Sequence, residues 1–359
     1  MSLRQPNFIL ANLSRGIFAV TVAVTALTSV ALANPATRAT PPALDPGAVV
    51  FVYNRFGDDR NPGSSIRIDQ FVDHIDELVV GGYTVLPLVR VIEAVRGGDR
   101  LPDRTISVTI DDATLSAYRE AYPRLRTAGV PFTLFVATDA IDGKLGSHMS
   151  WDQVRELYSA GVTIGALTAS ALPMAERSAQ ENRDDIKRGK ARFLAELGFV
   201  PELFAYPHGE NSLPVRNIVE QAGFLAAFGQ QSGVAYPGAE IFNLPRFIMN
   251  DSFGSIDRFR LAANALPLPV TDVTPADPVL VGNPPILGFT VPDGIGNLGR
   301  LACFATGQGR TAVEQLGSNR IEVRIADAFP PGRARVNCTL PAEDDRWRWF
   351  GVQLFIPEP

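Results

Sequence analysis

The sequence predicts an α/β fold, an irregular (β/α)7-type barrel followed by a small C-terminal β module, on three observations. Short apolar runs alternate with amphipathic stretches along residues 48–265. Repeated β–α units predict a parallel sheet, and about seven units in roughly 220 residues favour a barrel over an open sheet. A Pro-rich stretch, 266–287, then precedes a tail, 288–359, that contains short alternating segments typical of β structure.

The first 33 residues differ in character from the rest of the chain. Arg4 and Arg15 precede an uncharged apolar run that ends in Ala31-Leu32-Ala33, the pattern that a signal peptidase reads. We expect 1–33 to be a signal peptide, with an uncleaved membrane anchor as the alternative, because the run is at the short end for a membrane-spanning helix. Either way the body would be periplasmic or secreted. Residues 34–47, rich in Pro, Ala and Thr, are expected to form a linker.

The barrel elements follow from apolar periodicity and from helix caps. Buried strands read as continuous apolar runs, and the helices carry apolar residues on one face. Ser150 with Gln153, and Ser178 with Glu181, predict two capping boxes that start helices. The expected strands are 48–53, 83–86, 106–110, 132–137, 162–167, 203–206 and 224–228, and the expected helices are 69–80, 89–96, 115–128, 151–160, 179–197 and 213–222.

The tail is expected to be a small β module that contains both cysteines. In an oxidising compartment Cys303 and Cys338 predict one disulfide, and two buried thiols are the alternative. Trp347 and Trp349 have the spacing of one strand face, for which core packing or an inter-domain contact is favoured over stacking on a sugar.

The composition excludes some classes of partner. Of the 359 residues, 46% are hydrophobic and 20% are charged, as expected for a packed globular protein. The net charge is −5 and no block of Lys or Arg stands out, which argues against nucleic-acid binding. Membrane association is expected only through an uncleaved signal, and a protein partner stays open.

One dipeptide indicates chemistry. Asp111 and Asp112 end a predicted buried strand, and in a barrel the carboxyl ends of the strands hold the active site. Adjacent carboxylates repel one another and need a cation or a shared proton. One could bind a metal while the other acts as a base towards metal-bound water. The alternative is that they cap a helix.

Several motifs in order resemble the polysaccharide deacetylases, the NodB-homology carbohydrate esterases. Val-Thr-Ile-Asp-Asp at 108–112 is similar to the family's Thr-Phe-Asp-Asp motif. The segments 51–56, 130–136, 149–151, 161–165 and 204–209 are also similar to family motifs, so that the resemblance covers roughly 48–250. It implies the barrel fold and removal of N-acetyl groups from an amino-sugar polymer.

The resemblance also implies a divalent metal, usually zinc, that is held by one Asp and two His. Asp112 matches the metal ligand and Asp111 matches the base, but Leu167 and Ala171 stand where the two histidines are expected. Leu and Ala have no lone pair to offer, and zinc normally needs three protein ligands. Asn54 and Ala205 also replace a frequent histidine and an arginine of the family. The metal is therefore doubtful in this chain.

Only three histidines occur, and they are the candidates to compensate. His74 is expected on a helix surface and His148 in a loop. His208 follows the sixth predicted strand and is either a substitute ligand or acid, or an exposed loop residue. A rebuilt site from Asp112, His148 and His208 is a further, less favoured, possibility.

The candidate substrate contacts are Arg55, Tyr206, His208 and Arg246. Arg55 could bind a sugar or carboxylate group, or pair with an acid. Arg246 could neutralise Asp111 near the site, and a structural ion pair is equally expected. By descent the protein would be an exported deacetylase whose activity is impaired or lost. Three present functions remain open: a metal-dependent deacetylase of an exported or cell-wall amino-sugar polymer, a non-catalytic pseudo-enzyme that binds glycan, and a scaffold or partner subunit whose β module makes the contacts.

Overall fold

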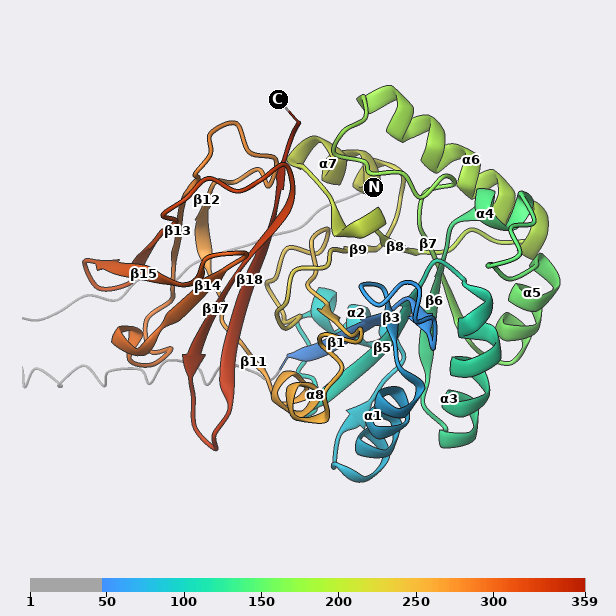
Figure 1. Ribbon diagram of the computed structural model, residues 1–359, viewed down its shortest axis with the longest axis horizontal. Helices are drawn as coiled ribbons and strands as arrows, with labels where there is room; N and C mark the ends of the chain where they lie inside the picture. The colour runs from blue at the N-terminus through green and yellow to red at the C-terminus, as the bar shows by residue number, and fades with distance from the viewer. Residues whose placement is uncertain (1–46, 359) are drawn as a thin grey trace, which may run out of the picture. The chain divides into compact units, whose positions relative to one another are not determined.

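The computed structural model describes residues 47–358 (Figure 1). The predicted signal peptide, 1–33, and all but the last residue of the predicted linker, 34–47, lie outside the described residues. None of the helices in residues 47–358 combines the length and the hydropathy of a membrane-spanning segment.

A parallel sheet in the order β10-β1-β5-β6-β7-β8-β9 forms the barrel, with β4 paired to β5. The segment that leads into β10 closes it, because Leu244 bridges to Phe228 at the end of β9 and Phe247 pairs with Phe51 of β1. The predicted barrel is thus confirmed. Its strands are β1 (Ala48–Tyr53), β4 (Thr84–Val85), β5 (Thr105–Asp111), β6 (Phe132–Val136), β7 (Thr163–Ala166), β8 (Leu203–Ala205), β9 (Ala226–Phe228) and β10 (Phe247–Ile248), and β2 (Arg55–Phe56) pairs separately with β3 (Ser65–Ile66).

Helices surround the barrel strands, as Figure 1 shows for α1, α3, α5 and α6. Both predicted capping boxes form, at Ser150 with Gln153 and at Ser178 with Glu181, and each satisfies backbone N–H groups that the first helical turn leaves free. The helices are α1 (Ile68–Val80), α2 (Leu88–Gly97), α3 (Tyr122–Ala128) with a π turn η1 (Ala117–Ala121) before it, α4 (Thr138–Asp142), α5 (Trp151–Ser159), α6 (Ala179–Leu197), α7 (Leu213–Gln221) with a 3-10 turn η2 (Pro207–Gly209) before it, and α8 (Ile256–Ala263).

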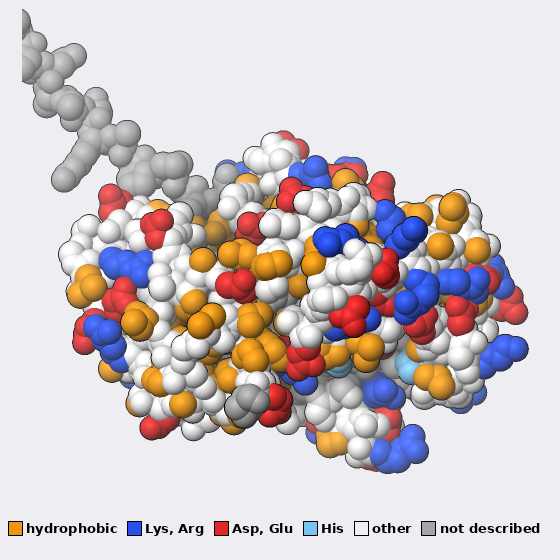
Figure 2. All heavy atoms as spheres, turned by 90° about the horizontal axis from the view of Figure 1, so that it is seen from above, with side chains coloured by type: hydrophobic (Ala, Val, Ile, Leu, Met, Phe, Trp, Pro, Cys, Tyr) orange, Lys and Arg blue, Asp and Glu red, His pale blue; other side chains and the backbone are white. Residues whose placement is uncertain are grey.

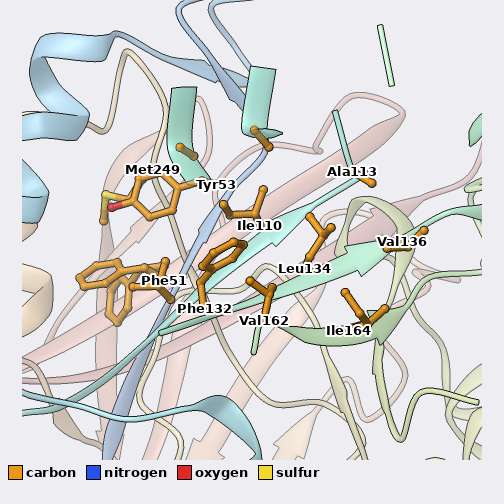
Figure 3. Packing of buried hydrophobic residues seen from close by; sticks show 14 of the residues in the cluster. Phe51, Tyr53, Ile110, Ala113, Phe132, Leu134, Val136, Val162, Ile164 and Met249 are labelled. Atoms are coloured by element: carbon orange, nitrogen blue, oxygen red, sulfur yellow. The ribbon is translucent and has the colours of Figure 1, made fainter. Parts of the chain in front are cut away.

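The strands bury both faces, one against the helices and one inside the barrel. In β5, Ile110 packs in the large core under the helices, together with Phe51 and Leu134 (Figure 3). The alternate side chains of β5, among them Thr109 and Asp111, are polar and buried. Because successive strand residues point to opposite faces, these polar side chains line the inside of the barrel.

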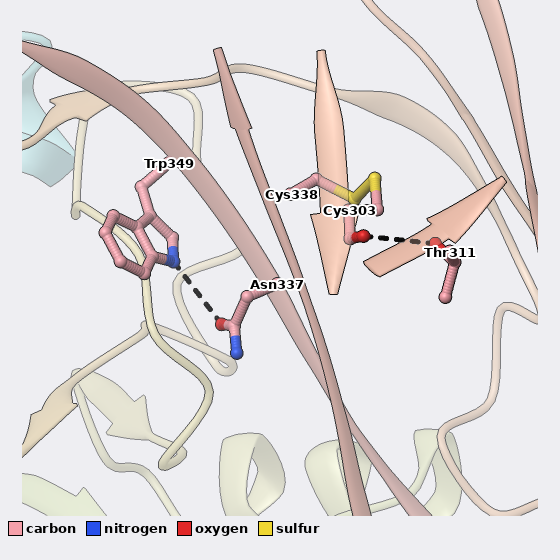
Figure 4. Close-up of a disulfide and its surroundings, with 5 residues drawn as sticks. All are labelled: Cys303, Thr311, Asn337, Cys338 and Trp349. Carbon is pink, nitrogen blue, oxygen red and sulfur yellow. Dashed lines mark hydrogen bonds between the residues drawn. A yellow bond between two sulfur atoms is a disulfide. The ribbon is translucent and has the colours of Figure 1, made fainter. Parts of the chain in front are cut away.

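The tail folds into a β module whose strands lie in the order β11-β18-β17-β14-β15-β16-β13-β12. Cys303 of β14 lies directly opposite Cys338 of β17, and the two form the predicted disulfide (Figure 4). The strands are β11 (Leu266–Pro267), β12 (Thr271–Thr274), β13 (Ile286–Thr290), β14 (Ala302–Ala305), β15 (Gly309–Leu316), β16 (Arg320–Arg324), β17 (Gly332–Pro341) and β18 (Trp347–Ile356), with a 3-10 turn η3 (Leu298–Arg300).

The stretch 266–287, expected to be a linker, contains two of these strands. β11 pairs with β18, and β12 pairs with β13, so both belong to the module's sheet. The prediction was wrong because it weighed the prolines alone. Leu268 between the two strands is buried in the module core, and this apolar contact holds the stretch in place.

β18 packs against the barrel. The indole of Trp349 meets the ring of Phe247 edge to face, with centroids 5.1 Å apart, and its N–H donates to Asn337. Gly351 lies so close to the backbone of Ser232 that a Cβ there would come within 2.3 Å of the Ser232 carbonyl oxygen. Trp349 is therefore a packing residue, as favoured, and its ring is not free to stack on a sugar.

Candidate functional site

The deepest part of the candidate site is an ion pair inside the barrel. Asp111, the last residue of β5, accepts hydrogen bonds from Nη1 and Nη2 of Arg246 at 2.7 and 2.9 Å. Arg246 is fully buried; it also donates to Thr109 Oγ1 and to the carbonyl oxygen of Gly229, and it lies over the ring of Phe135. The bidentate geometry fixes the orientation of the Asp111 carboxylate. Arg246 thus pairs with Asp111, an arrangement that both interpretations of Arg246 share.

Opposing effects act on the Asp111 carboxyl group. Burial is the largest of them and raises the pKa of Asp111 above its ordinary value. The positive charge and the hydrogen bonds of Arg246 act against this rise, and the negative charge of Asp112 adds to it. The side chain of Gln230 also lies near Asp111 and lowers its pKa.

Asp112 directly follows β5 and lies at the rim of the barrel, the edge formed by the carboxyl ends of the strands and the loops after them. It is half-buried and has φ 75°, and Ala113 after it has φ 47°, so two consecutive non-glycine residues adopt the left-handed region. Such conformations cost free energy and persist only where surrounding structure imposes them, most often at functional sites. The side-chain amide of Asn54, which follows β1, donates a hydrogen bond to Asp112.

The segment in which the resemblance places two metal-binding histidines is a well-held loop after β7. Ser170 Oγ donates to the buried carboxylate of Asp185 at 2.6 Å, and the N–H of Ala171 donates to Thr168 Oγ1 at 3.1 Å. Leu167 is buried in a hydrophobic cluster with Phe135, and Ala171 packs against the same cluster. The hydroxyl groups that shape the loop are present, while the side chains at 167 and 171 carry no donor atom.

The residues of this rim do not fit a zinc ion. Asp112 supplies one carboxylate, which accepts a hydrogen bond from the Asn54 amide. Leu167 and Ala171, in the loop after β7, have no side-chain atom that can bind a metal. Across residues 47–358, no group of three or more His, Cys, Asp or Glu side chains is arranged so that it could hold a metal ion. Tight zinc binding needs such a set, so the side chains of this rim do not support a chemical step at a bound zinc ion.

The prediction that His74 lies on the surface was wrong. Its side chain is fully buried between Tyr53 and α8, with Nδ1 3.0 Å from the Tyr53 hydroxyl and Nε2 2.8 Å from the Gly254 carbonyl oxygen, and it stacks on Phe259. Burial lowers the pKa of His74 to about 4. A 3.6-residue pattern of apolar residues misses such a histidine, because its polar atoms are satisfied by partners distant in sequence.

The other two histidines lie nearer to the acidic pair. His148 is half-buried beside Thr114, and His208 is exposed in η2 with φ 56°. Burial lowers the pKa of each; the charge of Asp112 acts the other way on both, and that of Asp111 also does so on His208. The rebuilt metal site from Asp112, His148 and His208 is therefore not formed at ligand distances, although both imidazoles lie near the Asp112 charge.

Two predicted substrate contacts have other partners. Tyr206 is fully buried, and its hydroxyl donates to the Phe242 carbonyl oxygen at 2.8 Å. Its prediction as a substrate contact was wrong, because the strand alternation turns it into the outer core. Arg55 lies 3.7 Å from Asp58, which is the acid pairing that was one of its two interpretations.

Sequence reasoning missed residues that the fold brings to the site from far away. Thr109 and Gln230 contact the Arg246–Asp111 pair, and Gln353 of β18 donates from its amide to the carbonyl oxygen of His208 at 2.9 Å. None of them stands in a local motif. For Thr109, the alternation within β5 was an available signal, because every second residue of that strand is polar.

Comparisons with known proteins agree with this architecture. A sequence model of the polysaccharide deacetylase family matches residues 98–227. The poly-β-1,6-N-acetyl-D-glucosamine N-deacetylase of Staphylococcus aureus is 23% identical over 170 residues, which are 42% of this chain and 57% of the relative. YxkH of Bacillus subtilis, provisionally assigned as a polysaccharide deacetylase, is 22% identical over 186 residues, 51% of this chain and 66% of its own length. The chain thus spans less than two thirds of the length of either relative.

A solved structure extends the agreement to three dimensions. IcaB from Ammonifex degensii superimposes with a TM-score of 0.54 and 26% identity, and the match covers 61% of this chain and 97% of that one. The family model over residues 98–227, the relatives of the same family and the shared fold lead to one conclusion: the barrel of this chain contains a polysaccharide deacetylase domain.

Proposed function

We propose that this chain is an exported member of the family that binds an amino-sugar polysaccharide at the barrel rim without a tightly held metal, and whose hydrolytic activity is impaired or lost. The observation that carries the proposal is the set of side chains on the rim. Asp112 and Asn54 supply polar atoms there, whereas Leu167 and Ala171, at the positions that match metal-binding histidines, supply none.

The rim offers what an N-acetylated sugar needs. Half-buried Asp112 accepts hydrogen bonds, and His148 and Arg55 lie close by. Sugar hydroxyl and acetamido N–H groups donate hydrogen bonds that a carboxylate oxygen accepts. The relatives named as poly-β-1,6-N-acetyl-D-glucosamine N-deacetylases act on a polymer of this chemistry, which supports the choice of ligand.

Hydrolysis is the second candidate, and one observation favours it. The Asp111–Arg246 pair is kept in a single orientation at the carboxyl end of β5, where a base towards a water molecule would stand. A base alone does not polarise the acetyl carbonyl group or lower the pKa of water, which are the contributions of the metal. The pair therefore supports descent from a hydrolase more than present activity.

The test is a binding titration and an activity assay on the same protein. Chitotetraose and a β-1,6-linked N-acetylglucosamine oligomer are titrated calorimetrically in the presence of EDTA, and acetate release is measured with and without added zinc. We expect binding in EDTA that Asp112→Ala weakens by about tenfold, the loss of about one charge-assisted hydrogen bond. We expect no acetate release above that of the Asp111→Asn variant.

The matched control is Asp152→Ala, which removes an exposed carboxylate from the start of α5 and should leave binding unchanged. Zinc-dependent acetate release that Asp111→Asn abolishes would show an active deacetylase. Absence of binding to both oligomers would remove the glycan-binding function.

A further inference from the structure

One face of the β module is turned towards the barrel rim and carries two arginines. In the β17–β18 pair, Arg335 lies opposite Gln353 and Arg333 opposite Phe355. Residues two apart share a strand face, so these side chains stand on the same face as Trp349, which packs against the barrel at Phe247.

Gln353 and Arg333 contact the loop that follows β8. The side-chain amide of Gln353 donates to the His208 carbonyl oxygen at 2.9 Å, while its own oxygen accepts from Arg335 Nε at 3.0 Å. Arg333 Nε lies 3.5 Å from a carboxylate oxygen of Glu210. The two arginines are therefore held beside residues 208–210, Arg333 by a direct contact and Arg335 through Gln353.

The same loop, residues 208–210, packs against Gln230, which is a neighbour of Asp111. A Cβ on Gly209 would lie 2.5 Å from the backbone nitrogen of Gln230, so the two segments pack without room for a side chain. The side chain of Gln230 lies near Asp111 and favours its charged form, and the charges of Asp111, Asp112 and Arg333 all act on His208. Arg335 is thus connected to Asp111 through a series of neighbouring residues, Gln353, residues 208–209 and Gln230. The two arginines therefore lie next to the same end of the barrel as the acidic pair.

The positive charges of Arg333 and Arg335 are not fully balanced by acidic side chains beside them. Arg335 is half-buried, its hydrogen-bond partner is the neutral amide of Gln353, and within residues 47–358 it forms no ion pair. Burial lowers the pKa of Arg335 to about 10, so the guanidinium is still cationic at neutral pH. Arg333 shares Glu210 through one long contact of 3.5 Å, and the other carboxylate oxygen of Glu210 has no hydrogen-bond partner. A partly desolvated cation without an acid partner is stabilised by an anion from solution.

We propose that Arg333 and Arg335 of the β module form an anion subsite beside the barrel rim, which takes a carboxylate carried by an amino-sugar polymer. The inference rests on the proposed glycan-binding function and deepens it, because it names the charge of the polymer and gives the module a part in binding. The bidentate donor geometry of a guanidinium suits a carboxylate.

The test compares two oligosaccharides that differ in their carboxylates. A tetrasaccharide of alternating N-acetylglucosamine and N-acetylmuramic acid and the neutral chitotetraose are titrated into the full chain without its signal segment at low salt. The acidic sugar should bind about tenfold more tightly, and added salt should reduce this advantage. Arg335→Gln and Arg333→Gln should each remove most of the advantage and leave the affinity for chitotetraose unchanged.

The matched control is Arg324→Gln on β16, which loses the same charge from an exposed pair with Glu314. It should keep the full preference. Arg333 is exposed, so its variant keeps the test valid if Arg335→Gln fails to fold. Equal affinities of the wild-type protein for the two sugars, or a preference kept by both variants, overturn the subsite alone. Failure of both sugars to bind overturns the proposed function as well.

Discussion

Arg246 and Asp111 are 135 residues apart in the chain and form a bidentate ion pair inside the barrel. The pair joins the end of β5 to the segment that closes the barrel between β9 and β10. Two charges withdrawn from water are costly, and their mutual hydrogen bonds offset the cost only while both partners are present. The pair therefore connects two parts of the barrel and also fixes the orientation of Asp111, a potential base.

Replacing Arg246 with Met should destabilise the fold by about 3–5 kcal/mol, because it leaves the Asp111 carboxylate buried without its partner. The free energy of unfolding in urea at pH 7 measures the loss. Arg324→Met, which breaks the exposed pair with Glu314, is the control and should cost less than about 1 kcal/mol.

A second substitution separates the buried charge from lost packing. In the double variant Arg246→Met, Asp111→Asn the unpaired charge is gone, so part of the stability should return. If the double variant is less stable than Arg246→Met alone, the uncompensated carboxylate is not the cause of the loss.

His74 makes stability depend on pH. Its pKa in the fold is about 4, below the unfolded value of 6.5, so below pH 6.5 the unfolded chain takes up a proton that the folded chain does not. The stability is fully present above pH 6.5 and is lost as the pH falls towards 4. At pH 5 the loss should be about 2 kcal/mol.

The measurement is urea unfolding of the wild-type protein and of His74→Gln at pH 7.5 and pH 5. Glutamine does not titrate, so the difference between the two pH values should be smaller in the variant by about 2 kcal/mol. Equal pH dependence in the two proteins would mean that His74 is protonated in the fold.

The sequence predicted the barrel well, because its signals are local. β1 has the predicted bounds, and Ser150 and Ser178 cap helices as expected, since an apolar run or a cap depends on a few neighbouring residues. Strand β10 and helix α8 were missed. β10 contains only two residues, too few to show a period.

The candidate site was predicted only in part. Asp111 and Asp112 were found because they stand together at a strand end. The burial of His74 and the contact of Gln353 with His208 were not, because each depends on a partner more than 140 residues away. No periodicity or spacing contains that information. The tail showed strands but not which of their faces meets the barrel.

The disulfide should stabilise the β module substantially. Cys303 and Cys338 are separated by 35 residues, and closing a loop of that length in the unfolded chain is worth about 3–4 kcal/mol in the chain-entropy model. The double variant Cys303→Ala, Cys338→Ala should lose about that amount in urea unfolding. Dithiothreitol should destabilise the wild-type protein and leave the variant unaffected; equal sensitivity of both would contradict the role of the bond.

Restoring histidines at 167 and 171 should create a zinc site. Two hydrogen bonds hold the loop after β7, one from Ser170 to Asp185 and one from the N–H of Ala171 to Thr168. The backbone of the loop is therefore in place before the substitutions. Histidine is among the residues that tolerate a positive φ, as position 171 requires with its φ of 55°. Together with Asp112, the two imidazoles would supply the three protein ligands of a catalytic zinc site.

Zinc titration by calorimetry should therefore give micromolar or tighter binding to Leu167→His, Ala171→His, against none at this affinity for the wild-type chain. Leu167→His alone supplies too few ligands and should bind weakly. The double substitution on an Asp112→Asn background is the decisive control, because it keeps both imidazoles and removes the carboxylate. Equal zinc affinity with and without Asp112 would place the new site elsewhere. No binding by the double variant would mean that residues 167 and 171 do not match the family's metal-binding histidines.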